Sequence, residues 1–129
     1  MRLRVITPEK VLCAVEVSEL TAPGIAGEFG VLAEHVSFLG GLDVGVLDYV
    51  SDGESRRIVV YGGYAEVEGD EVTVLADEAE LAEEIDSAQA KGLLADAQRE
   101  LAACEGGAED VDVLLAKLAR AEARVAALS

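Results

Sequence analysis

The sequence contains few of the residues on which enzyme and metal sites usually depend. Its 129 residues include one histidine, two cysteines and no tryptophan, and only 4% of them are aromatic. A single histidine leaves a zinc site short of ligands, and no nucleophile motif accompanies it. Cys13 and Cys104 lie far apart without a CxxC spacing, which predicts two reduced thiols. We therefore expect no catalytic constellation, no metal and no cofactor.

Basic residues are also scarce, since 26 Asp and Glu outnumber 10 Lys and Arg and the formal net charge is −16. So acidic a chain repels phosphate backbones and anionic lipids, which argues against nucleic acid as a partner. Solubility explains the charge, with a basic partner surface as the alternative. No apolar run approaches the ~20 residues of a membrane span, and no signal peptide follows Met1. The sequence predicts a cytoplasmic protein that reaches a membrane only through a partner.

The periodicity of the chain changes at Ile85. Before it the chain is rich in Val, punctuated by Gly and alternates between apolar and polar residues; after it the chain is rich in Ala. Short strands with frequent turns predict an antiparallel β-sandwich or a small barrel over residues 1–84. Apolar residues at every third or fourth position predict helices over residues 85–129. The expected fold class is α+β, with the β domain followed by an antiparallel two-helix hairpin.

Glycine and proline mark where we expect the strands to end. Gly69-Asp70 is a two-residue hairpin turn, and residues 51–55 form a hairpin loop. The Ala-Pro-Gly at residues 22–24 is expected to break a strand, and the glycines within residues 40–45 to bracket a turn. Residues 61–64, Tyr-Gly-Gly-Tyr, are expected to lie between two strands as a bulge or tight turn.

The helical part carries its own start and stop signals. Asp86 has the form of an N-cap, with Gln89 where a capping box favours it, and Gly106-Gly107 is expected to end the first helix in a left-handed glycine cap. Each helix has one apolar seam, formed by Ala90, Leu94, Ala97, Leu101 and Cys104 and by Val111, Leu114, Leu118, Ala121, Val125 and Leu128. Alanine limits the area that these seams bury, which predicts a hairpin that docks weakly and can detach.

The second helix also carries a basic stripe. Lys117, Arg120 and Arg124 recur at steps of three and four, so they share one side of an otherwise acidic chain. Two interpretations remain open. The stripe is a solvated face, or it contacts carboxylates or phosphates on another molecule.

Five motifs follow one another in an order that resembles one protein family. They are Thr7-Pro8-Glu9-Lys10-Val11, Ala22-Pro23-Gly24, Gly27-Glu28-Phe29-Gly30-Val31-Leu32 with His35, Tyr61-Gly62-Gly63-Tyr64, and Val72-Thr73-Val74-Leu75-Ala76-Asp77. Together with the β-then-α layout, they resemble the epsilon subunit of bacterial F-type ATP synthase, the counterpart of mitochondrial delta. The resemblance covers the whole chain.

This resemblance implies a ten-stranded β-sandwich, two antiparallel helices and a non-catalytic place in the central stalk. The sandwich would bind the gamma subunit and rest on the ring of c subunits, with Glu28, Gly30 and His35 at the c ring. A rotor subunit of this kind couples proton flow to ATP synthesis at the cytoplasmic face of the bacterial inner membrane.

The helical hairpin would be regulatory. In many family members it extends along gamma toward the alpha and beta subunits and inhibits ATP hydrolysis, and Lys117, Arg120 and Arg124 would then meet the catalytic beta subunit. Some members bind ATP on the folded hairpin. Of that motif this chain keeps Asp86 and the arginine pair but has Gln89 in place of an arginine. A stand-alone ATP-sensing module is the alternative function, although the lost cation predicts that ATP does not bind.

Overall fold

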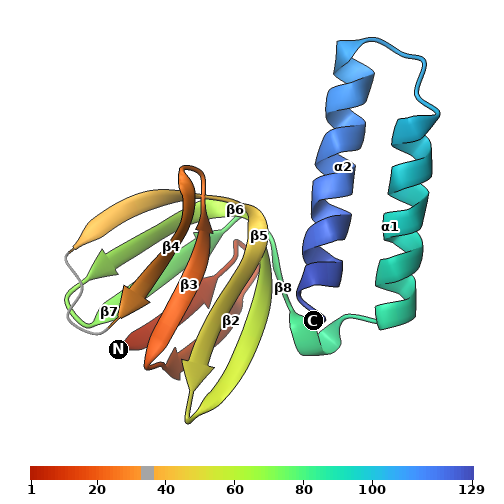
Figure 1. The fold of residues 1–129 in the computed structure, drawn as a ribbon. Helices are drawn as coiled ribbons and strands as arrows, with labels where there is room; N and C mark the ends of the chain where they lie inside the picture. Colours follow the sequence, from red (N-terminus) through yellow and green to blue (C-terminus); the bar gives the residue numbers. More distant parts are fainter. Residues whose placement is uncertain (33–36) are drawn as a thin grey trace.

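The computed structural model describes residues 1–32 and 37–129. A β-sandwich is followed by two helices that stand beside it, with α2 nearer the sandwich than α1 (Figure 1), which confirms the expected fold class. The elements are β1 (Arg2–Ile6), β2 (Val11–Glu16), β3 (Glu19–Gly24), β4 (Gly27–Leu32), β5 (Phe38–Ser51), β6 (Glu54–Glu68), β7 (Glu71–Ala76), β8 (Ala79–Leu81), the 3-10 helix η1 (Ala82–Glu84), α1 (Ser87–Ala102) and α2 (Ala108–Ala126).

The strands run in the order β2-β1-β7-β6-β5-β3-β4, with β8 paired to β6 off this path. Among the strands of the described residues, β1 and β7 form the one parallel pair. The described residues form eight strands rather than the ten that the resemblance implies. The number is smaller because β5 and β6 are each one long, unbroken strand, and the two pair with each other over almost their whole length. Along β6, one half pairs with β8 and the other half with β7, so a single strand serves both layers.

β6 changes partner at two glycines. Gly62 and Gly63 have φ values of 83° and 126°, in the region that favours glycine. At this point the Tyr61 N–H donates to the Glu78 carbonyl, and the Asp77 N–H donates to the Gly62 carbonyl. The predicted irregularity is therefore confirmed, but it lies inside one continuous strand and not between two strands.

The glycines of β5 make room for side chains and do not bracket a turn, so that prediction is wrong. A Cβ atom at Gly41 would lie 2.6 Å from Cδ1 of Ile25, and one at Gly45 would lie 2.6 Å from Cβ of Pro23. Residues 22–24 likewise belong to β3 and do not break it. The two-residue hairpin turn at residues 69–70 is confirmed. The hairpin expected at residues 51–55 is also present, but its loop is shorter than predicted, since residues 51, 54 and 55 belong to the strand ladder and only residues 52–53 form the turn.

Both faces of one half of β6 are covered. Ile58 and Val60 belong to the sandwich core, whereas Val59 and Tyr61 belong to a second apolar cluster shared with the hairpin. Four consecutive buried residues therefore separate two cores. This half of β6 is the base on which the helices rest.

Of the two signals predicted for the ends of α1, the one at its N-terminus is confirmed and the one at its C-terminus is wrong. The carboxylate of Asp86 accepts a hydrogen bond from the N–H three residues later at 2.9 Å, as an N-cap does. The left-handed glycine cap is wrong, since α1 ends at Ala103 in the right-handed conformation. The Cys104 N–H donates to the Leu101 carbonyl and tightens the last turn, so no left-handed residue is needed. Gly107 instead precedes α2 as an extended N-cap.

Every residue of the two predicted seams is buried or half-buried. Among the described residues, neither helix is long and apolar enough to cross a bilayer.

Candidate functional site

The hairpin meets the sandwich through a small apolar cluster. The helices contribute mainly alanines, and β6 contributes Val59 and Tyr61. The buried members are Val59, Tyr61, Ile85, Ala90, Ala123 and Ala127. The loop end of the hairpin stands clear of the sandwich (Figure 1). Since alanine buries little area, apolar contact alone holds this junction only modestly.

The two arginines of the basic stripe are paired across this junction. Arg120 donates through Nη2 to Oε2 of Glu78 at 2.8 Å, and Arg124 donates through Nε to Oε1 of Glu80 at 2.6 Å. The side chains of Arg124 and Glu80 are 19% and 32% exposed, against 43% and 64% for Arg120 and Glu78. The Arg124 pair is thus the better sheltered from water and is the stronger of the two.

Tyr61 links the two pairs. Its hydroxyl donates to Oε1 of Glu80 at 2.8 Å, and the guanidinium carbon of Arg120 lies 4.0 Å from the centroid of its ring. Burial and the hydrogen bond to Glu80 raise the pKa of Tyr61 above its ordinary value of 10.0, so the hydroxyl stays protonated. We call Tyr61, Glu78, Glu80, Arg120 and Arg124 the Glu–Arg cluster.

Lys117, the third member of the stripe, pairs with α1 and not with the sandwich. Its ammonium lies 2.8 Å from Oε2 of Glu100. All three cations of the stripe therefore contact carboxylates of their own chain in this conformation.

A cavity of about 330 Å³ lies at the Glu–Arg cluster, and its lining brings together only part of the predicted ATP motif. Asp86 and Gln89 are not among its lining residues, and Asp86 caps α1 instead. The lining residues are Tyr61, Glu78, Glu80, Leu93, Lys117, Arg120, Ala121 and Arg124. Two carboxylates neutralise the arginines here, so the cavity is a poor receptor for a polyphosphate.

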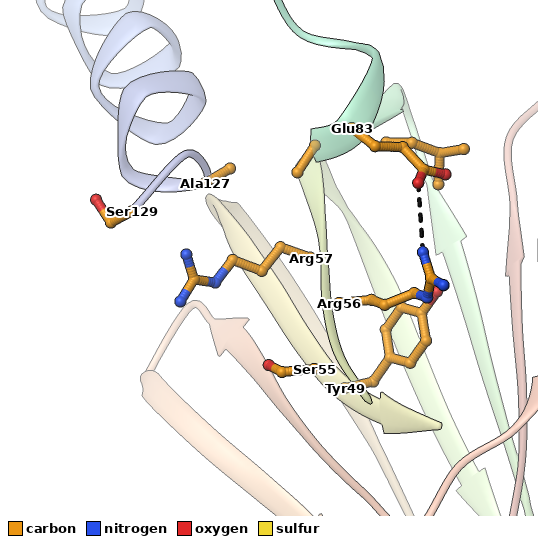
Figure 2. A pocket seen from close by; sticks show the side chains of 9 residues that line it. Tyr49, Ser55, Arg56, Arg57, Glu83, Ala127 and Ser129 are labelled. Atoms are coloured by element: carbon orange, nitrogen blue, oxygen red, sulfur yellow. Dashed lines mark hydrogen bonds and ion pairs between the residues drawn. The ribbon is translucent and has the colours of Figure 1, made fainter. Parts of the chain in front are cut away.

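A second cavity of about 320 Å³ lies where the tip of the β5–β6 hairpin meets the end of α2 (Figure 2). Its two arginines are also paired: Arg56 lies 3.3 Å from Glu83, and Arg57 lies 2.9 Å from Asp48. Burial raises the pKa of Tyr49 to about 12, and its hydroxyl lies 3.7 Å from Sγ of Cys13. With its cations paired and its phenol neutral, this cavity offers no activated nucleophile.

Of the residues expected at the c ring, Glu28 and Gly30 line neither of these two cavities. Glu28 and Gly30 are exposed on β4, an edge strand, and His35 lies outside the described residues. Glu28 lines a shallow groove between the sandwich and α2, which Glu122 also lines. Their predicted contact with c subunits stays a prediction.

Sequence reasoning missed an apolar stripe that crosses the outer face of the sheet. Neighbouring strands place Val11 opposite Ile6, Ile6 beside Leu75, and Leu75 beside Tyr64. The row ends at Ile25, which lies over the β5 glycine paired with Tyr64. We call these five residues the apolar stripe.

Four of the five residues of the apolar stripe are exposed, and Ile6 is half-buried. Val11 is 59% exposed, Leu75 51%, Tyr64 59% and Ile25 71%. β1, β6 and β7 each contribute one outward apolar residue, whereas their other outward positions near the stripe are polar or charged, as Arg4 and Thr73 are. Only the pairing of strands that are distant in the sequence joins these single residues into a continuous surface.

Comparison with known proteins gives a consistent result over the whole chain. The family model described as the β-sandwich domain of the ATP synthase delta/epsilon chain matches residues 1–82. The ATP synthase epsilon chain of Geobacter sp. (strain M21) is 43% identical over 125 residues, which are 97% of this chain and 91% of that protein. The corresponding protein of Solibacter usitatus is 44% identical over 126 residues, covering 98% and 93%.

Solved structures agree with this fold. A chain in the cryo-EM structure of Euglena gracilis mitochondrial ATP synthase, OSCP/F1/c-ring, matches with a TM-score of 0.84 and 26% identity, over 98% of this chain and 80% of that one. A chain from the central stalk and c-ring of Tetrahymena thermophila mitochondrial ATP synthase has the same fold, with a TM-score of 0.67 and 14% identity, over 100% of this chain and 96% of that one.

Proposed function

Since this chain belongs to the epsilon-chain family of ATP synthases and is a non-catalytic subunit of that enzyme, we propose that it is the rotor subunit that joins gamma to the c ring. In this role it couples proton flow to ATP synthesis at the cytoplasmic face of a bacterial inner membrane. The sandwich of residues 1–84 makes these contacts, and the hairpin of residues 85–129 is regulatory.

The apolar stripe is the observation that carries the proposal. Four of its five side chains are more than half exposed on a chain of net charge −16. Contiguous apolar surface on a soluble protein marks a site for a partner. The stripe lies on strands β1, β2, β6 and β7 and the turn after β3, away from the cluster that holds the helices. It is therefore free for the gamma subunit while the hairpin is docked.

The contact with the c ring is assigned to Glu28, Gly30 and His35. Glu28 and Gly30 are exposed on edge strand β4. Basic groups on the polar loops of c subunits would complement an acidic edge of this kind and guide its approach.

Regulation is assigned to the hairpin, through the same cations that hold it folded. Lys117, Arg120 and Arg124 can contact carboxylates of the catalytic beta subunit only after they leave their present partners. Inhibition of ATP hydrolysis by an extended hairpin therefore requires an exchange of ion pairs, from this chain to the alpha and beta subunits.

Co-purification tests the proposal. Expressed with the gamma subunit of its own genome, this chain is expected to elute with it as a one-to-one complex in size-exclusion chromatography. Membranes depleted of the chain are expected to lose ATP-driven proton pumping and to regain it when the purified chain is added. Separate elution, together with unchanged pumping after depletion, would contradict the proposal.

ATP is not expected to bind at the arginine pair. Arg120 and Arg124 already contact Glu78 and Glu80, and Gln89 brings no charge for a phosphate. Titration calorimetry with ATP at concentrations up to about 1 mM should therefore give only the heat of dilution. Even a weak site, with a dissociation constant of about 1 mM, would begin to fill in this range. A saturating heat with micromolar affinity would revive the ATP-sensing alternative.

A further inference from the structure

We propose that Glu78 and Glu80 are built-in anionic ligands for the arginines of α2, so that the chain latches its own hairpin without a bound nucleotide. The inference rests on the proposed function only in that the latched hairpin is the regulatory element. It adds what holds the hairpin folded and which residues must separate before it extends.

The sandwich presents the two carboxylates from a fixed frame. Glu80 belongs to β8, which pairs with β6 at three consecutive positions, and its direct partner there is Val59. Glu78 is held by its backbone, since its carbonyl accepts the N–H of Tyr61 at 2.9 Å. Both acids are thus attached to the strand that forms the base of the hairpin.

The helix presents its two cations with a matching spacing. Arg120 and Arg124 lie four residues apart on α2, so they stand one above the other on one face of the helix. They reach two acids that are two residues apart in the sequence, Glu78 in the bend before β8 and Glu80 on β8. The match allows both ion pairs to form at once.

Charged contacts decide the docking because the apolar contact is small. The buried side chains that the hairpin contributes are alanines, namely Ala90, Ala123 and Ala127, and the larger Val125 and Leu128 are only partly buried against the cluster. The sheltered Arg124–Glu80 pair shares its acceptor oxygen with the hydroxyl of Tyr61. Charge-assisted hydrogen bonds are the strong ones in such a setting, so their loss should shift the docking equilibrium measurably.

The chain also offers a matched control. The Lys117–Glu100 pair lies on the same hairpin and is also an ion pair of a cation of α2 with a glutamate at a similar distance, but it joins α1 to α2. Removing its acid leaves every contact of the junction in place. Glu100→Gln should therefore leave the hairpin docked.

Solution NMR on the isolated chain measures docking directly. The methyl groups of Ala123 and Ala127 share a cluster with Val59, so the folded hairpin should give cross-relaxation between them. The double variant Glu78→Gln, Glu80→Gln is expected to raise the undocked fraction about tenfold, as loss of charge-assisted bonds would. The amide signals of the sandwich core should stay unchanged and report that it is folded.

Tyr61→Phe gives a second, milder test. It removes the hydroxyl that donates to Glu80 and keeps the ring beneath Arg120, so an increase in the undocked fraction of about threefold is expected.

The inference is overturned if wild-type protein shows no cross-relaxation at the junction, if both variants dock as the wild type does, or if Glu100→Gln undocks equally. No gamma subunit is present, so a failed latch leaves the proposed binding to gamma and the c ring untouched. A failure to bind gamma would conversely leave these measurements valid.

Discussion

Replacing Tyr64 and Leu75 together by serine is expected to weaken binding to the gamma subunit about a hundredfold. The two side chains are direct neighbours on β6 and β7, at the middle of the apolar stripe. Truncating a well-buried residue at the centre of an interface costs about 2 kcal/mol or more, and each 1.4 kcal/mol is tenfold in affinity. Binding of the variant to immobilised gamma, at fixed salt, measures the loss.

The fold should survive this change, since Tyr64 is 59% and Leu75 51% exposed and both point away from the sandwich core. Val113→Ser is the matched control, because Val113 is 68% exposed on α2, outside the stripe. The control should bind gamma as the wild type does. Equal affinity of the double variant and the control would show that gamma contacts another surface.

Replacing Gly63 by alanine is expected to destabilise the protein by at least about 3 kcal/mol, a large share of the ~5–15 kcal/mol that folds a domain. Its φ of 126° is one that side chains rarely adopt, and a Cβ atom would lie 2.1 Å from the carbonyl oxygen of Leu75 and 2.8 Å from Cα of Ala76. These neighbours are backbone atoms of the β6–β7 ladder. These backbone atoms cannot move aside without disrupting the strand pairing at the point where β6 changes partner.

Urea denaturation followed by circular dichroism measures this loss. Gly69→Ala is the matched control, since Gly69 also has a positive φ, of 59°, but a Cβ atom there would meet nothing within 4 Å. Its cost should be about 1 kcal/mol, the strain of the left-handed conformation alone. If the two variants unfold at the same urea concentration, the close approach at Gly63 contributes nothing.

Much of the local structure was predictable from the sequence. The turn at residues 69–70, the N-cap at Asp86 and the seams of the two helices each depend on residues only a few positions apart. The left-handed cap after α1 was predicted wrongly for the same local reason: glycine permits that conformation without requiring it.

The candidate sites were harder to predict, because each joins distant segments. The Glu–Arg cluster brings residues of β6, of the β7–β8 segment and of α2 together across 42 and 44 positions of the sequence. One signal for the docking face was present: the unbroken apolar run from Ile58 to Tyr61, which is typical of a strand covered on both faces.

The sequence by itself determined the family, the change from strands to helices at Ile85, and the acids and bases available for pairing. Periodicity and turn chemistry act within a few residues, so they can be recognised without coordinates. Only the tertiary structure decided that β6 serves both layers, that single outward residues join into the apolar stripe, and that the cations of α2 meet acids of the sandwich and of α1. Those outcomes depend on which strands pair and which faces meet, and many distant contacts together set that choice.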